Sequence, residues 1–234
     1  MIIDKVLKSD QEIDVHGTNP RLTTFLNPIS YWMNRNNDAL QNFHNIHVDG
    51  ILLVLIFRLF GHKVTRRSFD MTSIAPAVFE ACSKSSSRIV TIGGTEEEAV
   101  LFNKQLATTF PSLDVVSYSG FQISVEDYLR ELKRAEPGVV LVGMGAPLQE
   151  NIALALYREF PAAYFTCGGF ITQSSIGMSY YPEWIDRFNL RFALRFTKER
   201  HYRRRFWLYI PGTIHFFCLL ALHSCRRLVS RGQA

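Results

Sequence analysis

Short apolar runs that end in glycine, each followed by a helix-like segment, are the strongest constraint on how this chain folds. The run VVLV at residues 139–142 leads through GMGAPLQ into the helical pattern of residues 151–160. Residues 88–94 (RIVTIGG) and 162–169 (AAYFTCGG) follow the same plan, and strand-like and helix-like segments alternate through residue 170. This alternation predicts an α/β fold with a Rossmann-like, mostly parallel sheet flanked by helices on both faces.

The three glycine-rich strand ends are the first candidates for a ligand site. They are Gly93 with Gly94, Gly143 with Gly145, and Gly168 with Gly169. Ligands of open parallel sheets bind beyond the carboxyl ends of the strands, where backbone N–H groups near helix starts suit a diphosphate. The sequence contains neither the GxGxxG dinucleotide fingerprint nor the GKS or GKT of a P-loop. Each glycine pair is equally compatible with a tight turn.

Three polar residues stand next to these strand ends. Gln149 and Glu150 fall on the first turn of a predicted helix that points into the same cleft, where an amide and a carboxylate can bind base or sugar hydroxyls. An acidic residue also favours a helix start by itself. Asp49 follows a short predicted strand in HVDG, where it is either a turn residue or a general base. The residues alone leave both questions open.

The histidine and cysteine spacings point away from metal and disulfide chemistry. The seven histidines form no HxxxH or HExxH pattern, and the four cysteines form no CxxC pair. A GxSxG nucleophile motif is also absent from the sequence. We therefore predict no metal site, no cofactor and no disulfide framework.

The basic charge is concentrated at the C-terminal end. From Arg187 onward the chain has eleven Lys and Arg residues and one acid, Glu199, so this segment carries a net charge of +10. The preceding 186 residues carry 15 basic and 20 acidic residues, a net charge of −5. An acidic body with a basic tail predicts a polyanionic partner such as a diphosphate, an anionic membrane surface or a nucleic acid.

An apolar, aromatic run at residues 206–222 lies inside this basic tail. It is bordered by arginines at 203–205 and 226–227, and Pro211, Gly212 and His215 interrupt it. A membrane span needs about 20 apolar residues, so this run favours a helix that lies in the membrane interface. A nucleic-acid-binding arm would not carry so long an apolar run, and we predict no nucleic-acid partner. We predict an α/β domain at residues 1–185 and a basic, membrane-associating helical appendage at residues 186–234.

Eight blocks along the chain resemble a known family. VGMGAPLQE is similar to the V-G-x-G-x-P-x-Q-E signature of the WecG/TagA/CpsF glycosyltransferases. FLNPIS, HVDG, TRRSFDMT, TIGGTEEE, SYSGF and TCGGF resemble further blocks of that family, as does the C-terminal stretch from YYPEW to the arginines at 203–205. The order and spacing of the blocks agree from about residue 22 to 205.

The resemblance implies a function and a set of site residues. The expected reaction is inverting, metal-independent transfer of a hexose from a UDP-sugar to a polyprenyl-diphosphate-linked saccharide. It would serve exopolysaccharide synthesis at the cytoplasmic face of the bacterial inner membrane. Asp49 matches the family's proposed base. The implied donor-binding residues are Asn27, Gly93, Gly94, Gly143, Gly145, Pro147, Gln149, Glu150, Gly168 and Gly169. Arg195, Arg200, Arg203 and Arg204 would bind diphosphates and the membrane.

The chain departs from the family pattern at several positions. The Asp of the family's G-G-x-F-D block is missing, with Thr172 or Gln173 in its place, and Arg191 and Phe192 replace a Glu and a Trp. These departures bear on the identity of the sugar and favour a hexose without an acetamido group. A homo-oligomer is compatible with the resemblance, because the family's active cleft lies near a subunit interface. The alternative hypothesis is a membrane-bound scaffold that binds a UDP-sugar without catalysis.

Overall fold

The structure of the chain is a computed structural model that describes residues 2–11, 19–121, 124–178, 180, 185, 191–198 and 200–232. Side chains are described for these residues except 11, 191, 192, 198, 200, 201 and 228–232. The predicted boundary between residues 185 and 186 meets residues 186–190, which lie outside the described ranges.

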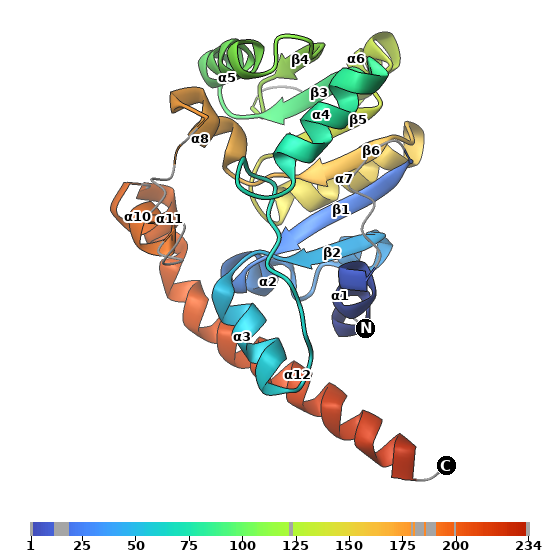
Figure 1. Cartoon of the computed structure of the whole chain (residues 1–234), viewed down its shortest axis with the longest axis vertical. Helices are drawn as coiled ribbons and strands as arrows, with labels where there is room; N and C mark the ends of the chain where they lie inside the picture. Colours follow the sequence, from blue (N-terminus) through green and yellow to red (C-terminus); the bar gives the residue numbers. More distant parts are fainter. Residues whose placement is uncertain are drawn as a thin grey trace.

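Six parallel strands form one sheet in the order β2-β1-β6-β5-β3-β4 (Figure 1). The strands are β1 (Arg21–Leu26), β2 (Asn45–Val48), β3 (Ile89–Gly93), β4 (Val115–Tyr118), β5 (Val139–Gly143) and β6 (Ala163–Thr166). Every pair of neighbouring strands is parallel, so the prediction of a mostly parallel sheet is confirmed. Their carboxyl ends therefore meet along one edge of the sheet, where the glycine-rich turns also lie.

Helices cover both faces of the sheet. Alternate residues of each strand point to opposite faces, so Val90 and Ile92 enter one core cluster while Ile89 enters the other. One face is covered by α4 (Ala75–Ser85), α5 (Glu96–Thr109) and α8 (Phe170–Ile176). The other is covered by α1 (Ile2–Gln11), α3 (Ile51–Leu59), α6 (Val125–Ala135) and α7 (Leu148–Glu159). The short helices α2 (Pro28–Asn34) and η1 (Asp38–Asn42) connect β1 to β2.

Polar caps start the helices that follow the strands. Asn27 follows β1 and caps α2, because its Oδ1 accepts hydrogen bonds from the N–H groups of Ile29 and Ser30 at 3.0 Å each. Thr95 caps α5 in a capping box with Glu98, as expected from a threonine followed by glutamates. These caps fix the direction in which each chain leaves the edge of the sheet.

The closest backbone approach along this edge joins β3 and β5. Gly93 and Gly143 are paired in register, and a Cβ on Gly93 would lie 2.4 Å from the carbonyl oxygen of Gly143. The chain continues from β3 to β4 on one side and from β5 to β6 on the other. Connections that diverge in this way leave a crevice at the carboxyl ends of the two strands.

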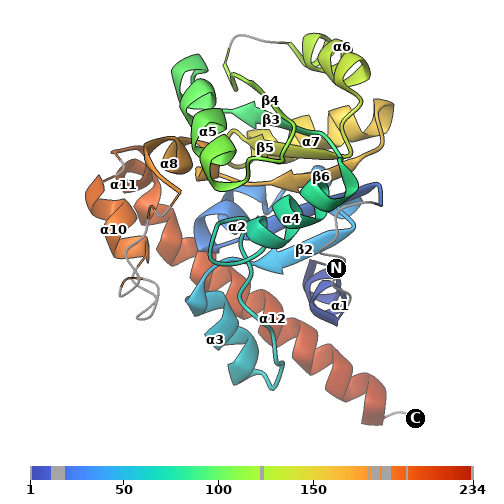
Figure 2. The ribbon, with the colours of Figure 1, turned by 45° about the horizontal axis from the view of Figure 1, so that its top comes forward.

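The C-terminal segment folds back on the body as helices. It comprises α10 (Arg191–Lys198), α11 (Arg200–Arg205), η2 (Phe206–Leu208) and α12 (Tyr209–Gly232). α12 crosses α2, lies beside α3 and extends beyond the body (Figures 1 and 2). The helix predicted for this run is present, and it is continuous through Pro211 and Gly212. Pro211 falls in the first turn, where its missing N–H is tolerated. Gly212 permits close packing, since a Cβ there would lie 2.1 Å from the carbonyl oxygen of Pro28.

The burial of His47 makes folding stability depend on pH. His47 lies in β2, is 6% exposed and stacks on Phe25 with ring centroids 5.6 Å apart. Burial, with a smaller effect from the charge of Arg67, lowers the pKa of His47 to about 4. The unfolded chain binds the proton with a pKa of about 6.5, so stability falls as the pH drops below that value. We expect His47 to account for a loss of roughly 2 to 3 kcal/mol between pH 7 and 4.5.

Urea unfolding of the wild type and of His47→Gln at these two pH values measures this contribution. The variant should lose less stability on acidification than the wild type by about that amount. An equal loss in both proteins would assign the pH dependence to other groups.

Candidate active site

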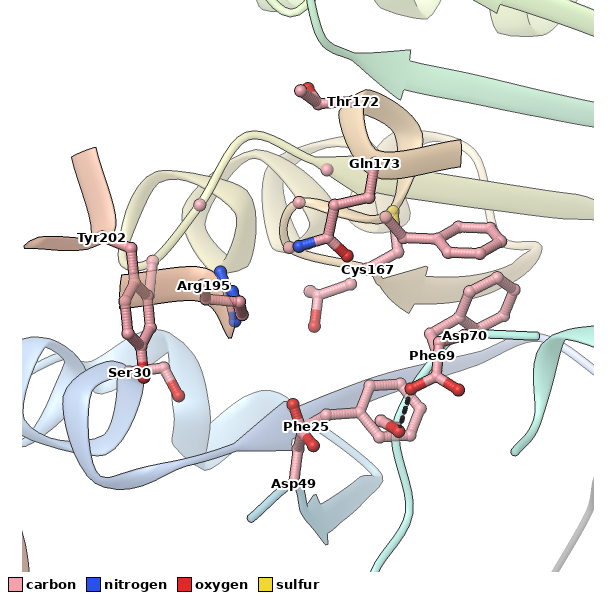
Figure 3. Close-up of a pocket in the computed structure, with 18 of the residues that line it drawn as sticks. Phe25, Ser30, Asp49, Phe69, Asp70, Cys167, Thr172, Gln173, Arg195 and Tyr202 are labelled. Carbon is pink, nitrogen blue, oxygen red and sulfur yellow. Dashed lines mark hydrogen bonds between the residues drawn. The ribbon is translucent and has the colours of Figure 1, made fainter. Parts of the chain in front are cut away.

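A cavity of about 1280 Å³ opens at the carboxyl ends of the strands (Figure 3). Pockets for a single small ligand are usually about 300–1,000 Å³, so this cavity has room for two reactants. Nine residues predicted from the sequence line it: Asn27, Asp49, Gly94, Gly143, Gly145, Gln149, Gly168, Gly169 and Arg195. Segments from residue 25 to residue 209 therefore contribute to one site.

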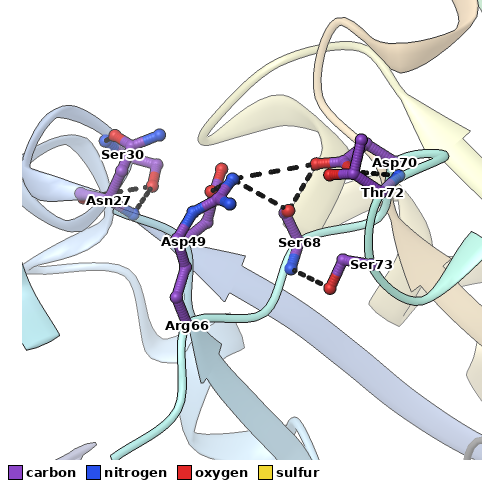
Figure 4. A network of polar contacts seen from close by, with 8 residues as sticks. All are labelled: Asn27, Ser30, Asp49, Arg66, Ser68, Asp70, Thr72 and Ser73. Atoms are coloured by element: carbon purple, nitrogen blue, oxygen red, sulfur yellow. Dashed lines mark hydrogen bonds and ion pairs between the residues drawn. The ribbon is translucent and has the colours of Figure 1, made fainter. Parts of the chain in front are cut away.

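Asp49 presents its carboxylate to this cavity from the end of β2. Its side chain is 29% exposed, and its Oδ1 lies 3.3 Å from Nη2 of Arg66 (Figure 4). The same nitrogen is 3.2 Å from Oγ of Ser68 and 3.9 Å from Oδ2 of Asp70. Asp70 also accepts a hydrogen bond from Ser68. The carboxylates of Asp49 and Asp70 thus share the guanidinium of Arg66, and the Asp49 carboxylate stays partly exposed.

The chain after α3 positions this network. Val48 and Arg66 form a parallel bridge, and the N–H of Arg67 donates to the carbonyl of Val48 at 2.8 Å. The segment that carries Arg66 is therefore held against β2, beside Asp49. Our sequence analysis assigned no site role to Arg66, Ser68 or Asp70, although all three lie within the TRRSFDMT block and line the cavity.

Gln149 and Glu150 occupy different positions, which corrects one sequence prediction. Gln149 lines the cavity, and its Oε1 accepts from the N–H of Gly168 at 3.1 Å. Glu150 is fully buried and does not line the cavity, so direct contact with a donor is not available to it. Its Oε1 instead accepts from Nε2 of Gln149 at 2.9 Å and from Oγ1 of Thr24 at 3.2 Å.

This buried network extends from Glu150 back to the cavity. Oγ1 of Thr166, a cavity residue, donates to Oγ1 of Thr24 at 2.7 Å. Burial raises the pKa of Glu150 and favours its neutral form. A neutral acid can be buried here even though its Oε2 has no hydrogen-bond partner among the described residues. The role of Glu150 in this network is to hold the amide of Gln149 in one orientation.

The glycine turns differ in what their backbone offers. Within the described part of the chain, the N–H groups of Gly94, Gly145 and Gly169 have no hydrogen-bond partner, and all three residues line the cavity. Gly94 and Gly145 have φ values of +68° and +76°, which turn the backbone sharply away from the strands. The N–H of Gly168 is already bonded to Gln149.

Two more of the predicted donor-binding residues, besides Glu150, do not line the cavity. Gly93 is packed against Gly143 and serves the strand contact. Pro147 precedes α7 and is absent from the cavity lining. We therefore assign both residues to the shape of the turns rather than to ligand contact.

Two arginines of the C-terminal segment approach the glycine turns. The guanidinium of Arg195 lies 4.5 Å from the ring centroid of Tyr202, and a Cβ on Gly169 would lie 3.9 Å from its Nη2. A Cβ on Gly145 would lie 3.6 Å from Nη1 of Arg205. Both arginines line the cavity (Figure 3 shows Arg195 and Tyr202). Cations beside backbone N–H groups are suited to a diphosphate.

The other predicted arginines lie elsewhere. Arg203 and Arg204 are exposed and do not line the cavity, so Arg205 takes the position expected of them. The side chain of Arg200 lies outside the described part of the chain, as do those of Arg191 and Phe192. Tyr202, Arg205 and Tyr209 all line the cavity, at spacings of three and four residues.

Thr172 and Gln173, at the position of the missing family Asp, both line the cavity. Oγ1 of Thr172 donates to Oε2 of Glu98 at 3.0 Å. Gln173 lies beside Gly169, where a Cβ would be 3.3 Å from its Nε2. An amide at this place can donate to and accept from sugar hydroxyls, whereas a carboxylate only accepts.

Other chemistries have little support in this cavity. Cys167 lines it, but burial raises the pKa of its thiol, so the reactive thiolate is disfavoured. Among the described residues there is no group of three or more His, Cys, Asp or Glu side chains that could hold a metal ion. The polar groups that line the cavity include carboxylates, arginines and amides, beside hydroxyl, aromatic and aliphatic side chains.

Comparison with known proteins identifies the family. The sequence profile of the Glycosyl transferase WecG/TagA/CpsF family matches residues 6–229. This chain belongs to that family. It is 32% identical over 221 residues to a UDP-Gal:alpha-D-GlcNAc-diphosphoundecaprenol beta-1,4-galactosyltransferase of Shigella boydii, covering 91% of this chain and 93% of that protein. It is 24% identical over 162 residues to an N-acetylglucosaminyldiphosphoundecaprenol N-acetyl-beta-D-mannosaminyltransferase of Bacillus subtilis, covering 68% and 62% of the two chains.

The WecG/TagA/CpsF membership confirms the resemblance found in the sequence and the prediction that the chain is a glycosyltransferase. The match extends through the C-terminal helices, which supply Arg195, Arg205 and Tyr209 to the cavity. In this glycosyltransferase the basic tail is therefore part of the pocket wall as well as a surface.

The network behind the cavity gives a test of the role of Glu150. Glu150→Ala would leave the donors on Gln149 and Thr24 without their acceptor and open a cavity, at a cost of about 2–4 kcal/mol. Glu150→Gln keeps an acceptor oxygen and a neutral group, so we expect a loss below about 1 kcal/mol. Chemical denaturation of both variants measures the difference. Equal losses would show that the carboxyl group is not held as a neutral acceptor.

Proposed function

We propose that this glycosyltransferase transfers a hexose from a UDP-sugar to a saccharide linked to polyprenyl diphosphate, with inversion at the anomeric carbon. The named substrates of the Shigella boydii and Bacillus subtilis relatives support the substrate classes, because both names include a sugar linked to diphosphoundecaprenol. The observation that carries the proposal is the Asp49 carboxylate, open to a cavity large enough for two reactants. The product would be an intermediate of exopolysaccharide or another cell-surface polysaccharide.

The donor diphosphate has a natural place beside the glycine turns. The N–H groups of Gly94, Gly145 and Gly169 and the guanidinium groups of Arg195 and Arg205 provide hydrogen bonds and positive charge. Charge on the departing UDP grows as the sugar–phosphate bond breaks, and fixed donors are most effective where charge develops. We therefore propose that these groups stabilise the leaving group without a metal ion.

Asp49 is proposed as the general base. Its carboxylate takes the proton from an acceptor hydroxyl while that oxygen bonds to the anomeric carbon and the bond to UDP breaks. Attack on the face opposite the leaving group inverts the configuration. Arg66, shared with Asp70, holds the Asp49 side chain in place.

The donor sugar is proposed to be a hexose, with UDP-galactose the first candidate because of the 32% identical relative. Gln173, where the family pattern has an Asp, is the residue we expect to influence the choice of sugar. UDP-sugars are cytoplasmic metabolites, so we place the enzyme at the cytoplasmic face of the bacterial inner membrane. A homo-oligomer stays a prediction from the sequence resemblance.

The transfer reaction is the direct test. The full chain is incubated with a panel of UDP-sugars, a short-chain lipid-diphosphate-linked N-acetylglucosamine and EDTA, and the product is analysed by mass spectrometry. We expect one added hexose, with full activity in EDTA. Binding of UDP without transfer from any donor would favour a non-catalytic scaffold, and transfer abolished by EDTA and restored by a divalent cation would contradict metal independence.

Replacing the proposed base tests the mechanism. Asp49→Asn should lower kcat by about 10²- to 10⁴-fold, the usual contribution of a general base, while UDP binding stays near normal. Asp38→Asn is the matched control, because Asp38 is an exposed residue of η1 away from the cavity. Near-normal turnover of Asp49→Asn would remove Asp49 from this role.

The cationic side of the donor site gives a second test. Arg205→Gln and Arg195→Gln should each weaken UDP binding roughly tenfold or more, because a hydrogen bond to a charged group contributes about 1.5–3 kcal/mol. Arg203→Gln removes the same charge from an exposed position outside the cavity and should leave UDP affinity unchanged. Titration calorimetry with UDP compares the three, and an equal loss in all of them would indicate only a long-range charge effect.

A further inference from the structure

One face of α12 is apolar and exposed. Trp207 of η2 and Ile210, Ile214 and Phe217 of α12 are 67%, 66%, 59% and 40% exposed. Their spacing of three or four residues places them on one side of the helix. The opposite side, which includes Phe216 and Leu220, is buried against the body. An exposed apolar row of this length marks an interaction surface.

A second apolar row on α3 adjoins the first. Leu55 and Leu59, one helical turn apart, are 50% and 72% exposed. Phe60 at the end of α3 contacts Phe217 of α12 edge to face, with ring centroids 5.2 Å apart. Figures 1 and 2 show the two helices side by side at one border of the molecule. Together the six exposed side chains, Leu55, Leu59, Trp207, Ile210, Ile214 and Phe217, form what we call the two-helix surface.

Positive charge accompanies the two-helix surface. Arg58 is exposed next to Leu59, Arg203 to Arg205 precede Trp207, and Arg226 is exposed near the far end of α12. Residues 51–60 and 202–232 contain no Asp or Glu. An apolar face bordered by arginines is complementary to a bilayer with anionic headgroups.

We propose that α3 and α12 together form a monotopic docking surface, on which α12 lies in the plane of an anionic bilayer and does not cross it. This inference rests on the proposed function, whose acceptor is lipid-linked. It adds to that function a second membrane-contacting helix, α3, and a fixed orientation of the enzyme on the membrane.

The helical stretch Tyr202–Arg227, which includes η2 and most of α12, is long and apolar enough to cross a membrane by length and composition. Its inner side, however, is bonded to the body. The Tyr31 hydroxyl lies 2.7 Å from Nδ1 of His215, and Nε2 of His223 lies 2.8 Å from Oδ1 of Asp4. Crossing would break these contacts and expose the packed face to lipid. An α12 that lies flat on the bilayer keeps these contacts and buries only its exposed apolar row.

A second copy of this chain fits the two-helix surface less well than a bilayer does. Two copies that paired through this face would bring two sets of arginines together without any acid on either helix. Like charges brought together disfavour association, whereas anionic headgroups attract the same residues.

The orientation would place the pocket at the level of the headgroups. Arg205 and Tyr209 line the cavity, and they alternate along the chain with Trp207 and Ile210, which belong to the two-helix surface. A diphosphate anchored by its lipid could therefore reach the cavity without leaving the bilayer.

Charged substitutions on α3 test the inference. The full chain is mixed with vesicles of phosphatidylglycerol and phosphatidylcholine, and bound protein is measured by flotation. The double variant Leu55→Glu, Leu59→Glu should bind at least about tenfold more weakly than the wild type, because two apolar contacts are lost and repulsion is added. The matched control is Val100→Glu, Leu101→Glu on α5, whose targets are 65% and 47% exposed, and its vesicle binding should stay within about twofold.

Unchanged vesicle binding of the α3 variant would overturn a role for α3. Transfer to an acceptor with a short, water-soluble lipid separates this result from the proposed function. If the variant loses vesicle binding and keeps that transfer, both proposals stand. If the wild type binds vesicles but transfers no sugar, the proposed function fails and the docking surface stands. Loss of a dimer with no loss of vesicle binding would assign the surface to a second copy.

Labelling the natural cysteines can show whether α12 lies on the bilayer or crosses it. Cys218 and Cys225 are exposed on α12, whereas Cys82 and Cys167 are buried. In a Cys218→Ser variant, a fluorophore on Cys225 should be quenched by brominated lipids but not by iodide trapped inside the vesicles. Quenching by the trapped iodide would show that the helix crosses the bilayer and would overturn the inference.

Discussion

The packing of α12 against the start of α2 is the contact on which much of the site depends. It is possible because Gly212 has no side chain, and the carbonyl of Pro28 occupies the space that a Cβ would need. Asn27, immediately before, caps α2 and lines the cavity. The same crossing therefore fixes the start of α12, where Tyr209 enters the cavity wall. A tail that was free of the body would leave the cavity open on this side and without Arg205.

A second layer of structure lies behind the cavity and is less visible in the sequence. Glu150 touches no solvent, yet it determines where the amide of Gln149 points, because its Oε1 accepts from Nε2 of that residue. The amide oxygen of Gln149 then accepts a hydrogen bond from the N–H of Gly168. The turn after β5 is thus tied to the turn after β6 through Gln149, whose orientation is held by a buried acid.

The sequence predicted the frame of the molecule well and the detail of the site less well. The alternation of strand-like and helix-like segments, with glycines at the strand ends, was sufficient to predict the α/β sheet. A buried parallel strand is a nearly continuous apolar run, so the end of the run marks the end of the strand. They placed Gln149 and Glu150 alike, since both follow the same turn, whereas helix geometry points one to the cavity and the other to the core. Arg66 and Asp70 were missed because their role depends on a bridge to β2 that no local pattern encodes.

The proposed chemistry and the membrane geometry lead to one consequence for how this enzyme works. The basic tail supplies Arg195 and Arg205 to the cavity, and it also carries the exposed apolar row of α12. The helices proposed to meet lipid would therefore also complete the proposed donor site. A polyprenyl-diphosphate acceptor is confined to the bilayer, and binding at a surface raises its local concentration relative to solution. The proposed orientation would then set the direction from which the acceptor hydroxyl reaches Asp49. Membrane docking and positioning of the nucleophile would therefore be two results of one packing arrangement, in which α12 is held on α2 and α3.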